Sequence, residues 1–227
     1  MVTFITVSDS LVLEVPGAKK FQLIGGDLCV DFCNTMGGTR EGTSHENLHS
    51  YPHFLAWCEQ VSVVNAAEAK LLKAKGVRDP EQAGGVLGRV IDLREAIYRI
   101  FRAIAQGANP SAADVALLNA ELSLSLGRLR INPGQNGQGF TWGWADQPPE
   151  LDHPLGPLAH SAAQMLASEE RLAHLRQCCA DNCGWLFVDS SKNHSRRWCD
   201  MRDCGNRAKV RRHRQKHPPA SGQEHHG

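Results

Sequence analysis

Four cysteines in the C-terminal part of the chain have the spacing of a metal site. They form two C-x4-C pairs that are separated by fifteen residues: Cys178, Cys183, Cys199 and Cys204. Each pair can form a tight turn that points two thiolates inward, and the spacer allows the two turns to meet around one tetrahedral zinc ion. Because four cysteine ligands leave no position for a catalytic water, this spacing predicts a structural zinc site.

The identity of the first ligand stays open in the sequence. Cys179 follows Cys178 directly and would give C-x3-C, whereas the matched C-x4-C of the second pair favours Cys178. Three histidines are rival ligands, and we expect them at the surface because four cysteines complete the set: His194, His213 and His217. The segment also needs a metal, because about 45 residues with one short apolar strand, residues 185–188, cannot form a stable core alone.

Positive charge is concentrated around these cysteines. The whole chain of 227 residues has a formal net charge of +1, but residues 171–217 contain twelve Lys and Arg against four Asp. This segment therefore carries +8 and the remainder carries −7. Such asymmetry is typical of a nucleic-acid-facing module beside a neutral or acidic domain. A solvated basic tail is the alternative interpretation.

Residues 205–217 predict a helix that is charged on almost every side. Two nearly opposite stripes contain the cations, with Arg207, Arg211 and Arg214 on one and Lys209, Arg212 and Lys216 on the other. A helix without an apolar face must project into solvent or toward a polyanion. We therefore expect nucleic-acid contacts from this helix and from the loop before Cys199, at Arg196, Arg197, Arg207, Lys209, Arg211, Arg212 and Arg214.

Most of these contacts would be to phosphates, and they would weaken as the salt concentration rises. Arginine pairs with guanine and asparagine with adenine in the major groove, so Arg207, Arg211 and Asn206 are the candidate base readers. For Asn206 we favour a local hydrogen bond around the zinc turn. Trp185 and Trp198 have the ring shape for stacking on bases, but we favour a place for both in the small core of the zinc module.

Two stretches of the chain resemble known families. The stretch CGWLFVDSSKNHSRRWCDMRDCGNRAKVRRH, residues 183–213, resembles the CGNR zinc finger, whose name corresponds to residues 204–207 here. The N-terminal GDLCVDFCNT is similar to the start of the ABATE domain, whose pattern is carried by Gly26, Leu28, Asp31, Phe32, Asn34 and Thr35. Together the resemblances imply a bacterial, stress-linked transcription regulator that binds DNA.

The predicted fold class is α+β, with a mostly helical N-terminal domain, a small antiparallel β element and a small C-terminal zinc finger. We divide the chain into a helix-rich ABATE-like domain (1–172), a CGNR-type finger (173–217) and a disordered tail (218–227). An extended segment is expected at 21–35 and a Gly-rich loop at 37–47. Helices are expected from Ser50, at 65–75 up to Gly76, and at 79–107, 110–126 and 154–172. Two strands, 128–132 and 139–145, are expected around a turn at 133–137.

The N-terminal domain offers fewer chemical signals. Asp31 and Asn34 are candidate ligand-binding residues. Asp27 and Asp31 would share one face of an extended segment, as suits acid–base chemistry, cation binding or plain exposure to solvent. Cys29 and Cys33 could form a second metal site together with Cys58 and His53. We favour the alternative, in which the two cysteines are buried as small hydrophobic side chains.

The composition limits the function classes. No stretch of eighteen apolar residues and no signal-peptide pattern occurs, so we expect a cytoplasmic protein without a membrane span. We find no phosphate loop and no catalytic triad, and we therefore expect no enzyme. The leading hypothesis is a DNA-binding regulator with one zinc ion whose N-terminal domain senses a small-molecule effector or forms a homodimer. The alternative is an enzyme or ligand-binding domain that uses the finger for nucleic-acid targeting or protein interaction.

Overall fold

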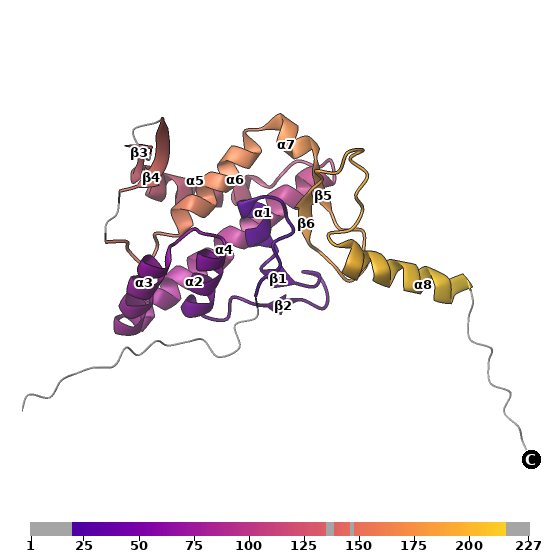
Figure 1. Ribbon diagram of the computed structural model, residues 1–227, viewed down its shortest axis with the longest axis horizontal. Helices are drawn as coiled ribbons and strands as arrows, with labels where there is room; N and C mark the ends of the chain where they lie inside the picture. The colour runs from indigo at the N-terminus through magenta and orange to yellow at the C-terminus, as the bar shows by residue number, and fades with distance from the viewer. Residues whose placement is uncertain (1–19, 135–138, 146–147, 217–227) are drawn as a thin grey trace, which may run out of the picture.

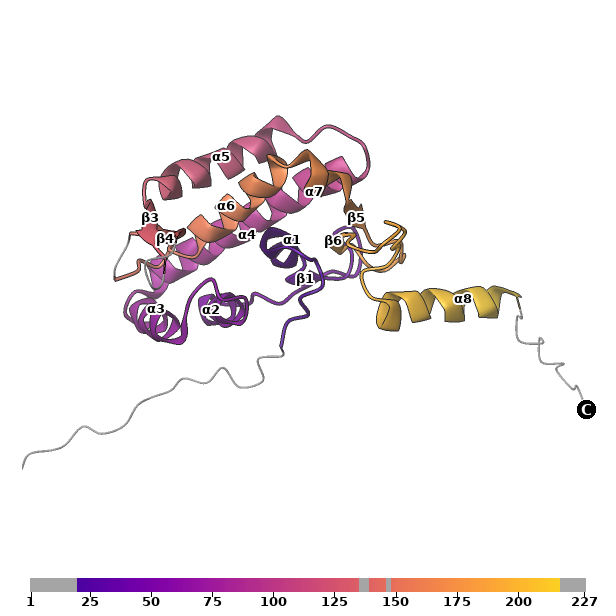
Figure 2. The same cartoon turned by 45° about the horizontal axis from the view of Figure 1, so that its top comes forward.

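The computed structural model describes residues 20–134, 139–145 and 148–216. Its fold is α+β, as predicted, with helices around a long central helix and three small antiparallel strand pairs. Figures 1 and 2 show the finger at one end of this helical body and the last helix extending away from it. Within the described residues, no helix is both long enough and apolar enough to cross a bilayer.

The central helix is α4, Pro80–Ala105. Asp79 accepts a hydrogen bond from the backbone N–H of Gln82 at 2.9 Å, and the proline fits the first turn because it lacks an N–H. Its apolar residues recur at three- and four-residue steps and are buried, among them Val90, Leu93 and Ile97. Burial of this stripe therefore provides the core around which the other helices pack.

Five helices contact α4, and α7 packs on α6. Their bounds are α1 Leu28–Cys33, α2 Tyr51–Gln60, α3 Ala66–Arg78, α5 Ala112–Leu126, α6 Leu155–Leu166 and α7 Glu169–Ala173. Figure 2 shows α5 and α6 on one side of α4 and α2 and α3 on the other. The short helix α1 packs against both α4 and α6 and so lies at the centre of the molecule.

Helix α1 corrects the prediction of an extended segment at residues 21–35. Gly26 adopts φ +80° in the preceding turn, and the Asp27 side chain accepts a hydrogen bond from the N–H of Cys29. The buried residues have helical spacing: Cys29, Val30, Phe32 and Cys33. The interpretation of Asp27 and Asp31 as neighbours on one strand face is therefore also wrong, because Asp27 caps the helix and Asp31 lies in its first turn.

Two further predictions about helices are wrong, one about where a helix ends and one about its continuity. Helix α3 continues past Gly76 to Arg78. A Cβ at Gly76 would lie 3.2 Å from the Tyr51 ring, so this glycine permits close packing and does not end the helix. The single helix expected at 154–172 is divided into α6 and α7, because the Ser168 side chain accepts a hydrogen bond from Arg171 and begins a new helix.

The strands form three antiparallel pairs, β1–β2, β3–β4 and β5–β6. Their bounds are β1 Met36–Gly37, β2 His45–Glu46, β3 Leu129–Pro133, β4 Phe140–Trp144, β5 Leu175–Gln177 and β6 Leu186–Val188. The β3–β4 pair confirms the predicted hairpin, with Ile131 opposite Trp142. Residues 135–137 of its predicted turn and the predicted tail, 218–227, lie outside the described residues.

The β5–β6 pair joins the finger to the helical body. Leu175 and Leu186 are buried in the same hydrophobic cluster as α4. The Asn34 side chain donates to the Leu186 carbonyl oxygen at 2.8 Å and accepts from the Leu186 N–H at 3.0 Å. The Trp185 indole N–H donates to the Met36 carbonyl oxygen at 2.8 Å. Strand β6 and Trp185, which directly precedes it, are therefore both bound to the N-terminal domain.

Candidate zinc centre and nucleic-acid interface

The four predicted sulfur ligands lie together in the finger. The sulfur atoms of Cys178, Cys183, Cys199 and Cys204 all lie within 4.8 Å of one another. The Sγ–Sγ distances are 3.7 Å for Cys183–Cys199 and 3.5 Å for Cys199–Cys204. A tetrahedral ion with Zn–S bonds of about 2.3 Å places its sulfur ligands about 3.8 Å apart. The cluster therefore has the size and the donor atoms for one zinc ion.

The doubled cysteine is resolved by the direction of each side chain. Cys178 is buried in the cluster, whereas Cys179 is exposed and lies outside it. The N–H of Cys178 donates to the Trp185 carbonyl oxygen at 2.9 Å, which places the first ligand directly beside the β5–β6 pair. The structure thus favours Cys178 as the first ligand, as the matched spacing predicts.

The second cysteine pair is positioned by an irregular helical turn. Residues Met201–Gly205 form a π-helical turn, η2, between Cys199 and the last helix, α8 Asn206–Lys216. Asp200 begins the turn because its carboxylate accepts from the N–H of Arg202 at 2.6 Å. This turn brings Cys204 back toward Cys199 and places α8 immediately after the metal site. The sequence predicts the last helix but not the π-helical turn.

The finger has a small core beside the sulfur cluster. Phe187 is fully buried there, and Trp185 and Trp198 are partly buried against it. This packing supports the core role that we favoured for the two tryptophans. The guanidinium of Arg196 lies 4.3 Å from the centre of the Phe187 ring and donates to the carbonyl oxygens of Trp198 and Cys199. Arg196 is therefore occupied by contacts within the finger.

Arg207 and Arg211, the predicted base readers of α8, contact the finger itself. Arg207 donates to the Cys204 sulfur at 3.1 Å and pairs with Asp203 at 3.2 Å. The hydrogen bond to Cys204 is the main cause that raises the pKa of Arg207. Arg211 forms an ion pair with Asp181, which lies between the first two cysteine ligands. Asn206 donates to the Arg202 carbonyl oxygen at 2.9 Å, which fits the local role that we favoured.

The remaining predicted cations of this region are directed toward solvent. Arg197, Lys209, Arg212 and Arg214 are all exposed. Arg197 lies 5.7 Å from the centre of the Trp198 ring. No hydrogen bond or ion pair joins Lys209, Arg212 or Arg214 to another of the described side chains. Figure 2 shows α8, the helix that carries Lys209, Arg212 and Arg214, extending away from the helical body.

Asp31 and Asn34 line a cleft between the N-terminal domain and the finger. The cleft has a volume of about 670 Å³, and its other lining residues include His45, His49, His53, Asp200 and Arg207. Burial raises the pKa of Asp31, whose carboxylate accepts from the Gly25 N–H at 2.7 Å. The Asn34 amide is already bound to Leu186 on both sides. The structure therefore brings both residues to one cleft, where Asn34 has a structural role.

The second metal site that we considered does not form. Among the described residues, the four finger cysteines are the sole group of three or more His, Cys, Asp or Glu side chains that could hold a metal ion. Cys29, Cys33 and Cys58 are buried instead, and burial raises the pKa of the Cys33 thiol to about 12. These cysteines pack as small hydrophobic side chains, as we favoured.

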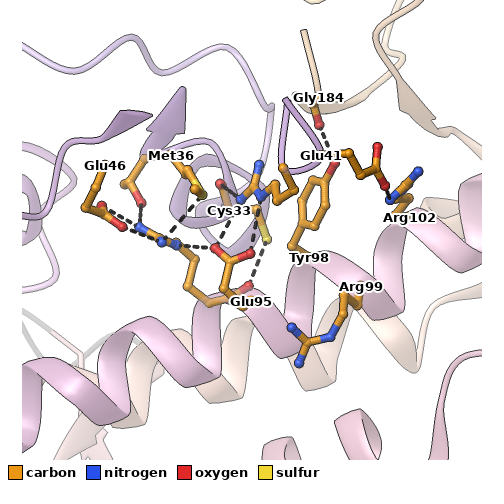
Figure 3. Close-up of polar contacts among 12 residues, drawn as sticks. Cys33, Met36, Glu41, Glu46, Glu95, Tyr98, Arg99, Arg102 and Gly184 are labelled. Atoms are coloured by element: carbon orange, nitrogen blue, oxygen red, sulfur yellow. Dashed lines mark hydrogen bonds and ion pairs between the residues drawn. The ribbon is translucent and has the colours of Figure 1, made fainter. Parts of the chain in front are cut away.

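A buried charge network links α4 to the loop before α2, and it was not predicted from the sequence. Arg94 is 1% exposed and donates to Glu46 at 2.6 Å and to Glu95 at 2.9 Å. Arg40 pairs with Glu95 at 3.2 Å and stacks 3.5 Å from the centre of the Tyr98 ring. Figure 3 shows the labelled members of this network, Glu46, Glu95 and Tyr98, between α4 and the loop before α2. The signal was the position of Arg94 on the apolar stripe of α4, four residues after Val90.

Comparison with known families agrees with this arrangement. The profile of the ABATE family, described as "putative stress-induced transcription regulator", matches residues 26–169. The chain belongs to the ABATE family. Its ABATE domain is followed by a match to the CGNR zinc finger at residues 174–217, which contains all four clustered cysteines. No curated protein matches the chain.

Proposed function

We propose that this ABATE-family protein is a DNA-binding transcription regulator whose zinc finger holds α8 against the duplex. The observation that supports it most strongly is the position of α8, which begins two residues after the ligand Cys204 and carries exposed cations away from the body. Phosphates attract such a helix through electrostatics that carry no base information. Base reading, if α8 enters the major groove, would need side chains at the groove floor.

Zinc would supply folding free energy and a fixed origin for the helix. Bound by Cys178, Cys183, Cys199 and Cys204, a structural zinc ion contributes on the order of 10 kcal/mol to the folding of a small module. The apolar core of the finger contributes little folding free energy by comparison, because Phe187 and its neighbours are only a few side chains. The regulator would act where bacterial DNA lies, in the cytoplasm.

A titration of duplex DNA at several salt concentrations tests this function. The logarithm of the binding constant should fall linearly with the logarithm of the salt concentration, by about 0.9 for each phosphate neutralised. A parallel titration with RNA duplex and single strands determines which nucleic acid is preferred. Absence of salt-dependent binding to any of them would contradict the proposal and leave a protein-interaction role for the finger.

A small-molecule effector is a second candidate function, supported by the cleft between the ABATE domain and the finger. Its lining comes from both parts, with His45 and His49 on one and Asp200 and Arg207 on the other. Trp57 also lines it, and its buried indole N–H has no hydrogen-bond partner among the described groups. A ligand there would touch the segment that carries α8, so ligand and DNA would change each other's affinity by the same factor.

The same cleft is where an enzymatic alternative would have to lie. Asp31 is its carboxylate with a raised pKa, but the backbone N–H of Gly25 already occupies one carboxylate oxygen. A screen of metabolites by tryptophan fluorescence, followed by DNA titration with each compound that binds, distinguishes an effector from an enzyme substrate. An effector changes the DNA affinity and is recovered intact, whereas a substrate is converted.

A further inference from the structure

The cations of α8 are divided by their contacts into two groups on roughly opposite sides of the helix. Successive residues advance by about 100° around an α-helix, so Arg207 and Arg211 share one side while Lys209 and Arg212 share the other. The first pair is bound to acidic or sulfur groups of the finger. The side chains of the second pair are exposed and make no hydrogen bond or ion pair with the described part of the chain.

Arg207 is placed to stabilise the metal ligands. Its Nη2 atom lies 3.1 Å from the Cys204 sulfur and 3.2 Å from an Asp203 carboxylate oxygen. One zinc ion with four thiolates has a net charge of −2, and a guanidinium hydrogen bond to a ligand sulfur offsets part of it. Groups that contact metal ligands in this way commonly affect metal affinity by 10- to 100-fold.

Arg211 is placed to orient the helix. It pairs with Asp181, which lies in the turn between Cys178 and Cys183. The pair therefore joins α8 to the first cysteine turn, while Arg207 joins it to the second. The side chains of Arg211 and Asp181 are 50% and 69% exposed, so their ion pair contributes little to stability. Its main role is to fix the direction of α8.

The outward pair has no acidic side chain of the finger to neutralise it. Asp181 and Asp203 are paired with the inward arginines. The other two acids bind backbone N–H groups, Asp189 those of Ser191 and Arg196 and Asp200 that of Arg202. Lys209 and Arg212 thus carry charge that is left for a partner, and their spacing of three residues places both on one helical face.

We propose that Lys209 and Arg212 form the DNA-backbone contact of α8, and that Arg207 and Arg211 are positioning residues which hold the zinc site and the helix. This assignment rests on the proposed DNA binding. It differs from the division expected from the sequence, in which Arg207 and Arg211 read bases. Arg214 is exposed and continues the stripe of Arg207 and Arg211 beyond the finger, so it belongs to neither pair.

Two charge-matched double variants test the division. Arg207→Gln/Arg211→Gln and Lys209→Gln/Arg212→Gln each remove two positive charges from the same helix. Zinc affinity is measured by competition with a chromophoric chelator, and DNA affinity by titration of a duplex at several salt concentrations in excess zinc. The zinc measurement needs no DNA and therefore reports on the inward pair even if the proposed function fails.

The outward variant should lose about 1.8 from the log–log salt slope, since each phosphate contact contributes about 0.9. Its zinc affinity should stay within twofold of the wild type. The inward variant should bind zinc 10- to 100-fold more weakly and keep the wild-type salt slope once zinc is saturating. Arg207→Lys keeps the charge without the planar guanidinium, so its zinc affinity should be intermediate; this single variant also decides the matter if the inward double variant does not fold.

Three outcomes would overturn the division. An unchanged salt slope in the outward variant removes the assigned contact surface. A wild-type zinc affinity in both the inward variant and Arg207→Lys removes the positioning role. Absence of DNA binding by the wild-type protein refutes the proposed function and the outward half of the inference together, whatever the zinc affinities are.

Discussion

Tyr98 donates its hydroxyl proton to the Gly184 carbonyl oxygen across 2.9 Å, although 86 residues separate the two in the chain. Tyr98 lies on the central helix α4, and Gly184 directly follows the zinc ligand Cys183. The Gly184 N–H donates in turn to the Gly38 carbonyl oxygen at 2.9 Å. Residues of the N-terminal domain therefore bind both the N–H and the carbonyl oxygen of Gly184, next to the first cysteine turn. The finger is packed against that domain and is not an independent module on a linker.

Replacing Tyr98 by phenylalanine tests this attachment. The ring and its stacking with Arg40 remain, but the buried Gly184 carbonyl oxygen loses its donor, which typically costs about 1–3 kcal/mol. We expect a lower free energy of unfolding in urea and a weaker affinity for zinc. A variant with wild-type stability and wild-type zinc affinity would show that this contact does not support the cysteine turn.

The doubled cysteine provides a matched pair of variants. Cys178→Ser removes a sulfur of the cluster and should prevent stoichiometric zinc binding, whereas Cys179→Ser changes an exposed thiol outside it and should leave one zinc per chain. Elemental analysis of the two purified proteins measures the stoichiometry. One zinc in the first variant and none in the second would mean that the neighbouring sulfur is the ligand.

Removal of zinc should unfold part of the molecule and not all of it. With a chelator, amide protons of residues 199–216 should lose protection against hydrogen exchange, because the small core around Phe187 cannot hold them alone. Amides of α4 should remain protected, since the main cluster around Leu93 and Ile97 does not depend on the metal. Equal loss of protection in both regions would show that the whole chain folds only with zinc.

The pair between Glu46 and buried Arg94 predicts a pH dependence. Desolvation alone would raise the pKa of Glu46, but the bonds from Arg94 and from the N–H groups of Leu48 and Asn47 outweigh it, and the net shift is downward. A carboxylate with a depressed folded pKa stabilises the protein above its unfolded pKa, near 4.3, and this contribution is lost as the pH falls through the folded pKa.

Glu46→Gln should therefore reduce the free energy of unfolding at pH 7 by about 2 kcal/mol, because Arg94, which is 1% exposed, loses one of its two carboxylate partners and keeps only Glu95. The difference between wild type and variant should narrow below about pH 4, where the wild-type carboxylate is protonated. Urea unfolding at several pH values measures it, and loss of zinc in acid affects both proteins alike. A difference that is constant from pH 3 to pH 7 would contradict the ion pair.

The zinc ligands could be predicted because their information is local. Cysteines separated by four residues within a turn carry their geometry in the spacing itself, and the matched second pair distinguishes Cys178 from Cys179. The long helix α4 could be predicted for a similar reason, since 26 residues provide many periods of its apolar stripe. Helix α1 has only six residues, so its period could not be separated from that of a strand.

The roles of individual charges could not be predicted, because they depend on partners that are distant in the chain. The helical wheel gives two equal stripes in α8, and only the positions of Asp181 and Cys204 distinguish Arg207 and Arg211 from Lys209. The contact between Tyr98 and Gly184 likewise follows from the docking of β5–β6 on the body and has no signature in either local sequence.

The central claim is that a zinc-anchored helix binds DNA, and one titration addresses it directly. Fluorescence anisotropy of a labelled duplex is measured with the zinc-loaded protein, then after chelation, and again after zinc is returned. The account predicts salt-sensitive binding that disappears with the metal and returns with it. Binding of equal strength with and without zinc, or no binding by the fully loaded protein, would contradict the account.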